Sequence, residues 1–452
     1  MTRWSDAFVR EALTGSPRGA DTRQRYSEIS TDTRSLRPGA LFVALEGPRF
    51  NGHDYLSAAR AAGATGAVVC RGTPAVDGLE CYEVEDTLHA LGALAAAVRH
   101  QIRGPVVAVT GTNGKTSTKE MVAAVLRTRF RTHATRENLN NLIGVPLTIV
   151  SAPEGTEALV LEAGANEPGE LARHRAIIDP TVTVITNVGA GHLEGFGSVE
   201  TVLHEKLELA RDVPLAVVGT APPELAAGVQ RRARRSLTAG VADADVVPEA
   251  VTVGPDGKAR ISVDGVTFTL PYAGLHLAAN AMLAWALVRS LDLDRSRSAR
   301  ALESVTFPGG RSEVVTQGGM TIVNDAYNAN PESFAAAIAT ARAMRAGRPL
   351  VFVAGTMREL GPRAPALHAE VMRQLVELEP TILAVVGDFV EASTAYAGRL
   401  GDRLLTAADP VALGPSLAAR LTGNELVFLK ASRGVALERI LPFLFIGSDQ
   451  RR

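Results

Sequence analysis

The chain has 452 residues, of which 46% are hydrophobic and 21% charged, and its 47 basic and 48 acidic residues leave a formal net charge of −1. This length is enough to bury several cores and predicts about three domains. The balance of charge excludes a general electrostatic attraction to nucleic acid or to an anionic membrane, so local groups must hold any anionic ligand.

The N-terminal segment and the cysteine content predict a soluble protein of the cytoplasm. The sequence begins MTRWSDAFVREAL, without the apolar stretch of a signal peptide, and has no run of about 18 uncharged apolar residues that would insert into a membrane. Cys70 and Cys81 are the two cysteines. They are too few for a disulfide framework and lack the spacing of a metal site, so we interpret them as incidental thiols in a reducing compartment.

Residues 25–100 predict a small α/β unit. Short apolar runs such as ALFVAL and GAVVC alternate there with alanine-rich helical stretches. Gly104 and Pro105 then interrupt the chain before a new strand, VVAVTG. We therefore place the first domain boundary after residue 103.

The rest of the chain predicts two further units. Strand-like runs at ALVLEAG, TVTVITNVG and LAVVG, separated by helical patterns, indicate a parallel sheet covered on both faces. Between residues 247 and 270 short alternating runs around GPDG and VDGV are typical of hairpins, so we expect a small antiparallel patch. Strand and helix patterns alternate again after FPGGR. The prediction is an α/β protein with a small α/β N-terminal domain (1–103), a central domain with a P-loop-type, mostly parallel sheet (104–306) and a Rossmann-like C-terminal domain (307–452).

A glycine-rich turn, GTNGKT, follows the apolar run VVAVT and leads into helix-forming residues. Such a turn at a helix N-terminus aims backbone N–H groups at one point, where phosphate oxygens bind. Gly111 and Gly114 permit the tight path, Lys115 can reach the β- and γ-phosphates, and the Thr116 hydroxyl can ligate Mg²⁺. The full Walker spacing would need glycine in place of Val109, so the motif is a shortened form, and a helix-capping turn without a ligand is the alternative interpretation.

Two further side chains stand where a parallel sheet presents ligand-binding groups. Glu162 ends the run ALVLE and His192 follows VITNVGAG, so both are expected beyond the carboxyl ends of strands. A carboxylate there can hold the Mg²⁺ that accompanies a nucleotide. Taken singly, Glu162 is more often a helix cap or a surface group, and His192 a hydrogen-bonded structural histidine.

The motifs GTNGKTST, EAGANEPGE and TNVGAGHLEGFGSVE, followed by EKLEL, resemble those of the Mur ligases of bacterial cell-wall synthesis in order and spacing. The resemblance extends over nearly the whole chain. STDTRSLRPGALFVALEGPRFNGHDYL is similar to the uridine-binding N-terminal domain of that family, and ENLNNLIGVPLT to its substrate loop. FPGGRSE, NDAYNANPESFAAAI, MRELG and KASRGVALERI resemble its C-terminal domain, and DxYNANP is typical of the branch that adds D-alanyl-D-alanine.

The resemblance implies a three-domain, ATP-dependent amide ligase. ATP would phosphorylate the terminal carboxylate of a UDP-N-acetylmuramoyl-tripeptide, and the amine of D-Ala-D-Ala would attack the acyl phosphate to give amide, ADP and phosphate. Cations are needed because a carboxylate is a poor electrophile and the two reactants carry like charge. ATP and two Mg²⁺ ions are the implied cofactors, the two substrates are the implied partners, and a monomer is expected.

The resemblance also assigns roles to single residues. The predicted catalytic residues are Lys115, Glu162, His192 and Lys206. The predicted metal ligands are Thr116, Glu162, His192 and Lys206. Lys206 matches a carbamylated lysine of the family, and since carbon dioxide adds only to a neutral amine, that role needs a site that lowers the lysine pKa. The alternative is a solvated lysine that pairs with Glu205 or Glu208 on a helix.

The nucleotide is expected to contact the glycine-rich turn and four residues from other segments. Asn280 would face the adenine, Arg311 would reach the phosphates when the C-terminal domain closes, and Asp325 would contact the ribose beside Tyr327. On the residues alone, Asn280 is equally polar helix surface, Arg311 a solvated loop residue, and Asp325 part of an asparagine-rich turn before a helix. The complete expected set is Gly111, Thr112, Asn113, Gly114, Lys115, Thr116, Ser117, Asn280, Arg311, Asp325 and Tyr327.

The other substrates are expected to contact polar residues in loops, where such residues also serve as turn formers. The uridine-diphosphate segment matches at Thr33, Arg34, Asn51, Gly52 and His53, and the muramoyl-peptide loop at Asn138, Asn140 and Asn141. Candidates for the pocket beside the nucleotide are Asn328 and Asn330, and candidates for the carboxylate of the incoming dipeptide are Ser432 and Arg433.

Three positions depart from the pattern of the family. Thr356 stands in place of a common acid, Ala431 in place of glycine and Leu277 in place of a frequent polar residue. The first two lie in the part of the chain expected to recognise the incoming amine substrate, although a short polar side chain such as Thr356 can also repack a loop.

Two other functions are alternatives to this ligase activity. One is a related ligase that adds a different amino acid or amine, and the other is a P-loop switch or scaffold without catalysis, which the retained charged residues disfavour. The sequence leaves the third residue of the tripeptide open between lysine and diaminopimelate.

Overall fold

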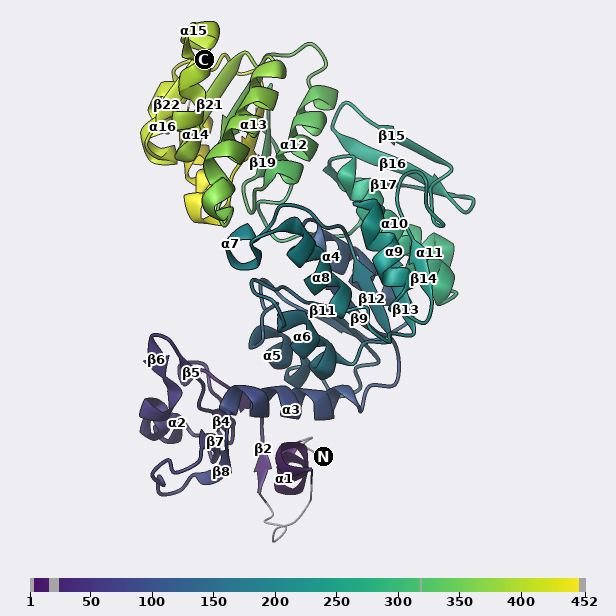
Figure 1. Cartoon of the computed structure of the whole chain (residues 1–452), viewed down its shortest axis with the longest axis vertical. Coiled ribbons are helices and arrows are strands. Elements are labelled where there is room, and N and C mark those ends of the chain that lie inside the picture. The colour runs from purple at the N-terminus through teal and green to yellow at the C-terminus, as the bar shows by residue number, and fades with distance from the viewer. Residues whose placement is uncertain (1–3, 16–23, 318, 447–452) are drawn as a thin grey trace.

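The computed structural model describes residues 4–15, 24–317 and 319–446. Three main sheets follow one another along the chain, from the purple N-terminal end to the yellow C-terminal end (Figure 1). Helices accompany every sheet, so the predicted α/β class is confirmed.

The first sheet is small and parallel, in the order β3-β4-β7-β8. Phe42, Ala59 and Ala67 belong to one apolar cluster that holds α2 against this sheet, while a hairpin of β5 and β6 projects from it. The elements are β1 (Trp4–Ser5), α1 (Asp6–Thr14), β2 (Arg25–Tyr26), β3 (Ile29–Ser30), β4 (Leu41–Val43), β5 (Glu46–Gly47), β6 (Phe50–Asn51), α2 (Leu56–Ala61), β7 (Gly66–Cys70), β8 (Glu80–Val84) and α3 (Thr87–Arg99).

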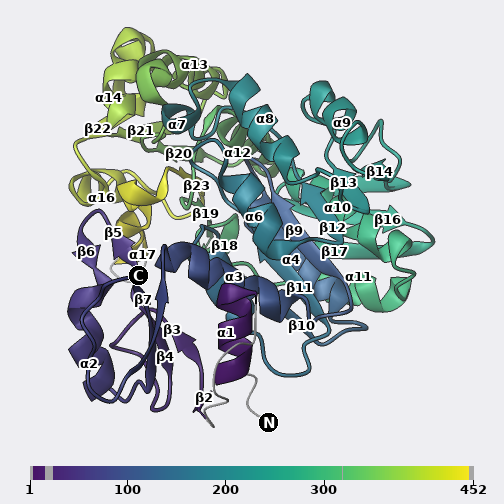
Figure 2. The same cartoon turned by 60° about the horizontal axis from the view of Figure 1, so that its bottom comes forward.

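Helix α3 connects the first sheet to the helices of the second, as Figure 2 shows. It packs against α5 and α6, and Arg99 in its last turn is buried. The Arg99 guanidinium donates to the carbonyls of Ile178 (2.7 Å), the last residue of α6, and of Asp179 (2.6 Å), its C-cap. Because α3 contacts both parts of the chain, the boundary after residue 103 stays a prediction.

The second sheet is parallel throughout, in the order β10-β11-β9-β12-β13-β14. Its strands are continuous apolar runs because both faces are covered. Val107 and Val109 face α4, α10 and α11, while Val106 and Ala108 face α5, α6 and α8. The elements are β9 (Val106–Thr110), α4 (Lys115–Leu126), β10 (Thr132–Ala134), α5 (Gly144–Val150), β11 (Ala158–Glu162), α6 (Glu170–Ile178), β12 (Val182–Ile185), α7 (Leu193–Phe196), α8 (Val199–Glu208), β13 (Leu215–Val218), α9 (Pro223–Gln230), β14 (Ser236–Thr238), α10 (His276–Ser290) and α11 (Arg295–Glu303).

The antiparallel patch that the alternating runs predicted is a separate sheet, which lies beside α10 (Figure 1). Its strands are β15 (Ala250–Val253), β16 (Lys258–Val263) and β17 (Val266–Ala273). Buried apolar side chains of β16 and β17, among them Ile261 and Phe268, pack into the same cluster as Trp285 of α10. The rings of Phe268 and Trp285 stack with centroids 5.6 Å apart. This sheet therefore extends the apolar face of α10.

The third sheet has the order β18-β19-β23-β20-β21-β22. Five strands are parallel, and β18 forms an antiparallel edge through its hairpin with β19, which the strand and helix alternation did not predict. The elements are β18 (Glu313–Gln317), β19 (Met320–Asp325), α12 (Pro331–Met344), β20 (Leu350–Ala354), α13 (Ala364–Glu377), β21 (Ile382–Val386), α14 (Asp388–Ser393), α15 (Ala397–Leu400), β22 (Leu404–Ala407), α16 (Pro410–Ala418), β23 (Leu426–Lys430) and α17 (Leu441–Ile446). The boundary at residues 306 and 307 also stays a prediction.

None of the helices in the described part of the chain combines the length and the apolar character that crossing a membrane requires.

Arg99→Ala is expected to destabilise the protein, because the carbonyls of Ile178 and Asp179 would lose a buried charged donor. We expect the free energy of unfolding to fall by about 2–3 kcal/mol, measured by urea denaturation. Arg129→Ala is the control, because the exposed Arg129 guanidinium donates to the carbonyl of Leu291 at 3.1 Å and otherwise lies over the Phe130 ring, 5.4 Å from its centre. Equal losses in both variants would contradict a role for the α3 contact.

Candidate active site

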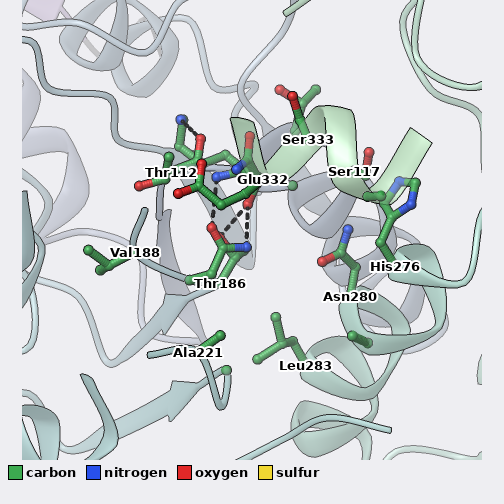
Figure 3. A pocket seen from close by; sticks show the side chains of 18 of the residues that line it. Thr112, Ser117, Thr186, Val188, Ala221, His276, Asn280, Leu283, Glu332 and Ser333 are labelled. Atoms are coloured by element: carbon green, nitrogen blue, oxygen red, sulfur yellow. Dashed lines mark hydrogen bonds between the residues drawn. The ribbon is translucent and has the colours of Figure 1, made fainter. Parts of the chain in front are cut away.

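A cavity of about 1010 Å³ opens where the carboxyl ends of the central strands meet α10 and the third sheet. In Figure 3, His276, Asn280 and Leu283 line it from α10, while Thr186 and Val188 line it from the segment that leaves β12. The cavity therefore lies at the sheet edge where parallel α/β folds bind ligands.

The glycine-rich turn, residues 111–114, forms the floor between β9 and α4 and has no room for side chains at its glycines. A Cβ atom on Gly111 would lie 1.9 Å from Thr186 Oγ1, and one on Gly114 would lie 2.8 Å from Asn280 Nδ2. Gly114 also has a φ of +77°, which L side chains rarely adopt. The turn is thus fixed by its own backbone and by two neighbouring segments.

Asn187, just after β12, holds the turn through its backbone and its side chain. The N–H of Thr112 donates to the Asn187 carbonyl and the N–H of Asn113 to Asn187 Oδ1, both at 2.9 Å. Two of the amides that we expected to face phosphate are therefore already bonded. The first turn of α4, which begins at Lys115, leaves further N–H groups for a ligand by the geometry of any helix N-terminus.

Lys115 lies over the same turn. Its Nζ donates to the carbonyls of Gly111 (2.9 Å) and Thr112 (3.1 Å), and burial lowers its pKa. Thr116 and Ser117 follow it on the buried side of α4 and line the cavity. The expected phosphate-binding residues are thus together in space.

Glu162 ends β11 at the cavity and has the features of a cation ligand. The residue is buried, its Oε1 accepts a hydrogen bond of 2.9 Å from Asn140 Nδ2, and its Oε2 has no hydrogen-bond partner in the described part of the chain. A buried carboxylate oxygen without a donor is costly unless a cation binds it. Within residues 4–15, 24–317 and 319–446, no three His, Cys, Asp or Glu side chains are grouped so as to hold a metal ion.

His192 lines the same cavity with its backbone in the left-handed region, at a φ of 55°. Its Nδ1 forms an ion pair of 2.6 Å with Glu359 Oε2, which comes from the loop after β20. The Glu359 pKa is lowered, chiefly by this hydrogen bond. His192 therefore links the central sheet to the third sheet, a contact that its position in the sequence did not reveal.

Lys206 is buried within α8, with 1% of its surface exposed, and does not line the cavity. Its Nζ lies 5.8 Å from the centre of the Phe196 ring, and burial, followed by the charge of Lys115, lowers its pKa to about 7. The nearby His174 on α6 is also buried, which lowers its pKa to about 4 and keeps it neutral. The interpretation of Lys206 as a solvated lysine is therefore wrong.

The expected nucleotide residues from α10 and the third sheet converge on one side of the cavity. Asn280 is buried on α10 against Gly114, and the Arg311 guanidinium stacks on the Tyr327 ring at 3.8 Å. Asp325 accepts a hydrogen bond of 2.6 Å from Lys430 Nζ at the end of β23. Leu277, one of the departures, packs in the core beneath α10.

Two hydrogen-bonded contacts join α12 to the segments around the glycine-rich turn. The side-chain amides of Asn330 and Asn113 bond reciprocally, at 2.8 and 3.2 Å, and Glu332 Oε1 accepts from the Ala190 N–H at 2.8 Å. Asn330 also caps α12 by accepting from the Ser333 N–H at 2.9 Å. Asn330 is therefore the cap of α12, and it does not line the large cavity.

The expected substrate residues fall into three places. Asn138, Asn140 and Asn141 line the cavity at the end away from α10, and Asn328 lines its third-sheet side. The residues expected to bind uridine diphosphate lie around the first sheet, in the loop after β3, in β6 and in the turn that follows β6, and do not line this cavity: Thr33, Arg34, Asn51, Gly52 and His53. Within that group, Asn51 Oδ1 accepts from the His53 N–H at 3.0 Å, and Arg34 pairs with Asp32 at 2.7 Å.

Ser432 and Arg433 line neither the large cavity nor a smaller one of about 710 Å³ whose lining includes Glu194, Thr356, Arg358, Glu359 and Asp388. Arg433 pairs with Glu438 and lies 6.0 Å from the centre of the Tyr327 ring. Ser432 Oγ accepts from the Arg358 N–H at 2.9 Å. Thr356 Oγ1 accepts from the Asp388 N–H at 2.9 Å, so this short polar side chain satisfies a backbone group at the start of α14.

Several site residues were missed by the sequence interpretation. Asn187 follows a strand directly and could have been found by the strand-end rule that found Glu162. Lys430 ends β23 and could have been found by the same rule. Glu359 and His276 had no such signal, because Glu359 reaches the site through the packing of the third sheet against the second and His276 through the packing of α10.

Comparisons with known proteins agree along the whole chain. Three family descriptions match: "Mur ligase family, catalytic domain" at residues 25–143, "Mur ligase middle domain" at 109–288 and "Mur ligase, glutamate ligase domain" at 310–433. The UDP-N-acetylmuramoyl-tripeptide–D-alanyl-D-alanine ligase of Bacillus subtilis is 33% identical over 91% of this chain and 92% of its own, and that of Escherichia coli is 34% identical over 95% and 96%.

Solved structures give the same result. MurF from Acinetobacter baumannii superposes with a TM-score of 0.87 at 28% identity, covering 98% of this chain and 99% of that one. MurF ligase from Thermotoga maritima in complex with ADP superposes with a TM-score of 0.83 at 30% identity, covering 94% and 98%.

Gly114→Ala is expected to weaken nucleotide binding by about tenfold or more, because its Cβ would displace Asn280 and the turn. Gly72→Ala is the matched control, since Gly72 has a similar φ of +82° but no atom within 4 Å of the added Cβ. Both variants should lose about 1 kcal/mol of stability from backbone strain. Calorimetric titration with ADP measures the difference, and equal ADP affinities would contradict the steric role of Gly114.

Proposed function

The chain belongs to the Mur ligase family, and we propose that it catalyses the ATP-dependent joining of D-alanyl-D-alanine to UDP-N-acetylmuramoyl-tripeptide. The relatives of that name match nearly the full length of both chains. The observation that carries the proposal is that the glycine-rich turn, Glu162 and the asparagines of residues 138–141 line one continuous cavity.

The cavity provides for the activation of a carboxylate by ATP. The γ-phosphoryl group passes from ATP to the terminal carboxylate of the tripeptide and leaves ADP, and the dipeptide amine then displaces phosphate from the acyl phosphate. Lys115 and the first turn of α4 would neutralise the phosphates. Mg²⁺ held by Glu162 Oε2 and the Thr116 hydroxyl would neutralise charge on the transferring group.

The position of the turn sets the direction in which the substrates lie. On one side the cavity continues past Asn280 and Leu283 toward the ends of β13 and β14, which suits the adenosine, with Asp325, Tyr327 and Arg311 on the third-sheet wall. On the other side it continues toward the asparagines of residues 138–141, which suits the tripeptide. The carboxylate to be activated would therefore lie between Lys115 and Glu162.

The smaller cavity suits the incoming dipeptide. His192 lines the large cavity, its partner Glu359 lines the small one, and their ion pair stands between the two. Arg358 in the cavity wall, with Ser432 next to it, would supply donors for a carboxylate, and Asp388 and Glu359 would supply acceptors for an ammonium group. Arg433 would join them on release from Glu438. A dipeptide held there would present its amine toward His192.

The uridine diphosphate would extend from the tripeptide to the first sheet, where Thr33, Arg34, Asn51, Gly52 and His53 form its expected contacts. The second Mg²⁺, with His192 as a ligand, a monomeric state and a cytoplasmic location are further parts of the proposal.

Lys206 would carry the carbamate. Its burial and its lowered pKa meet the need for a neutral amine, and addition of carbon dioxide would turn a buried cation into a carboxylate on a long stem. That carboxylate, which extends from α8, would be a ligand of the metal ions.

The proposal is tested by ADP release from the purified protein with ATP, Mg²⁺ and each candidate pair of substrates. UDP-N-acetylmuramoyl-tripeptide with D-Ala-D-Ala should stimulate ADP release strongly, and each substrate alone should not. Stimulation by a single amino acid with a shorter muramoyl peptide would support a related ligase instead. No stimulation by any UDP-muramoyl peptide would refute the proposal.

Glu162→Gln keeps the shape of the side chain and removes its charge, so we expect kcat to fall by about a hundredfold or more. Glu157→Gln is the control, because Glu157 lies at the opposite end of the same strand and its carboxylate accepts from the Arg131 N–H at 2.8 Å. Steady-state ADP release measures both. A Glu162→Gln variant with wild-type kcat would exclude the proposed metal role.

Carbamylation of Lys206 predicts a carbamate signal in ¹³C NMR spectra recorded with labelled bicarbonate. The signal should disappear in Lys206→Ala and persist in Lys258→Ala, because Lys258 lies in the antiparallel sheet away from the cavity. The chain has five lysines, which keeps the spectrum simple. A signal that survives in Lys206→Ala would assign the carbamate elsewhere.

A further inference from the structure

Helix α6 begins without a capping side chain of its own. Its N-cap residue is Gly169, which offers no acceptor for the first N–H groups of the helix. Glu205, from the middle of α8, takes this place: its Oε2 accepts from the Gly169 N–H at 2.7 Å and its Oε1 from the Leu171 N–H at 2.6 Å. The carboxylate is buried, with 5% of the residue exposed, and lies at the positive end of the helix dipole.

The start of α6 is also the end of the segment that leaves β11 directly after Glu162. Residues 163–169 form this segment, which carries part of the cavity wall. A second carboxylate, that of Glu170, accepts from the N–H groups of Asn166 (2.6 Å) and Glu167 (3.2 Å). The distal half of the segment is therefore held by two carboxylates, one from its own helix and one from α8.

The proximal half of the same segment holds the loop expected to bind the tripeptide. The Gly164 N–H donates to the Asn140 carbonyl at 2.8 Å, and Asn140 Nδ2 donates to Glu162 Oε1 at 2.9 Å. A Cβ on Gly164 would lie 3.1 Å from the Asn140 side chain, so residues 163–169 are in close contact with the loop that carries Asn140. A shift of residues 163–169 would therefore move Asn140 and the hydrogen bond to Glu162.

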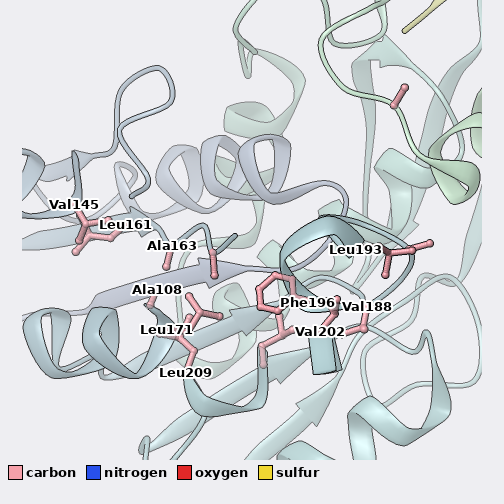
Figure 4. Close-up of a cluster of buried hydrophobic side chains, with 14 of the residues drawn as sticks. Ala108, Val145, Leu161, Ala163, Leu171, Val188, Leu193, Phe196, Val202 and Leu209 are labelled. Atoms are coloured by element: carbon pink, nitrogen blue, oxygen red, sulfur yellow. The ribbon is translucent and has the colours of Figure 1, made fainter. Parts of the chain in front are cut away.

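Apolar packing beneath the segment does not fix its position along α8. Figure 4 shows Ala163, Leu171 and Leu209 with Ala108 in one cluster of buried side chains, and Phe196 and Val202 close by. Such contacts are non-directional and tolerate sliding, whereas two hydrogen bonds to one carboxylate have a defined geometry. Lys206 is the next residue of α8, so the helix that positions the segment also positions Lys206.

We propose that Glu205 is a positioning residue of the acyl-transfer site. By capping α6 from the neighbouring helix, its carboxylate sets residues 163–169 against α8 and so fixes the relative positions of Glu162, Asn140 and Lys206. Glu205 itself does not line the cavity and touches no substrate. This inference rests on the proposed function, because the groups that it positions are those of the proposed reaction.

Glu205→Ala is expected to lower kcat/KM for UDP-N-acetylmuramoyl-tripeptide by about 10- to 100-fold, mostly through a higher KM. The KM for ATP should stay within about twofold, because Asn187 holds the glycine-rich turn independently. Glu205→Gln should give an intermediate loss, since its amide oxygen can accept one of the two N–H groups while its NH₂ group faces the other. Steady-state ADP release measures these kinetic constants for the wild type and for both variants.

Glu425→Ala is the matched control. Glu425 is also buried, and its carboxylate accepts from the N–H groups of Thr422 (2.5 Å) and Gly423 (2.9 Å). It stands before β23, at the end of that strand opposite to Lys430 and the cavity. The Glu425 variant should lose thermal stability as the Glu205 variant does, without a change in either KM. Glu205→Ala with wild-type kinetic constants, or with the same kinetic change as Glu425→Ala, would overturn the inference.

Hydrogen exchange separates this inference from the proposed function. In Glu205→Ala, or in Glu205→Gln if the alanine variant does not fold, the amides of residues 163–171 and 138–141 should exchange faster than in the wild type. An unchanged rate in residues 138–141 would overturn the positioning role. If the wild type releases no ADP with the tripeptide and dipeptide, the proposed function fails, and the exchange experiment still decides whether Glu205 orders the segment.

Discussion

The turn between β9 and α4 constrains the rest of the site because its backbone is enclosed on three sides. Thr186 leaves no space at Gly111, Asn280 leaves little at Gly114, and Asn187 already holds two of the N–H groups. A phosphate-binding backbone must be rigid before the ligand arrives, since amides that had to be reoriented on binding would cost affinity. The segment after β12 and helix α10 supply that rigidity, which is why residues far apart in the sequence surround the glycine-rich turn.

The buried charges around this turn depend on one another. Glu162, Lys206 and Glu205 are all buried, and a buried charge is tolerated only when hydrogen bonds or opposite charges compensate for lost hydration. Glu205 has two backbone donors, Glu162 has one donor and one oxygen without a partner, and Lys206 has its pKa lowered instead. Of these three groups, Glu205 is therefore the one whose buried charge is most fully compensated.

The third sheet takes part in the site through a few polar contacts. Asn330 bonds to Asn113, Glu332 to the N–H of Ala190, and Glu359 to His192. Polar contacts of this kind can break and form at a small net cost, because water replaces them, so they suit an interface that opens to admit substrates and closes for reaction. The same interface separates the two cavities, since His192 lines the large one and Glu359 the small one.

The sequence by itself determined the α/β class, the glycine-rich turn and the strand-end position of Glu162, because these follow from local patterns: apolar periodicity, backbone freedom at glycine and the end of a buried strand. It also located the antiparallel sheet through turn residues. Only the tertiary structure decided that Lys206 is buried, that Glu359 pairs with His192, that Asn187 occupies two amides of the turn, and that Glu205 caps another helix. Burial and hydrogen-bond partners depend on which helices and loops pack together, and contacts between residues distant in the chain leave no periodic signal in the sequence.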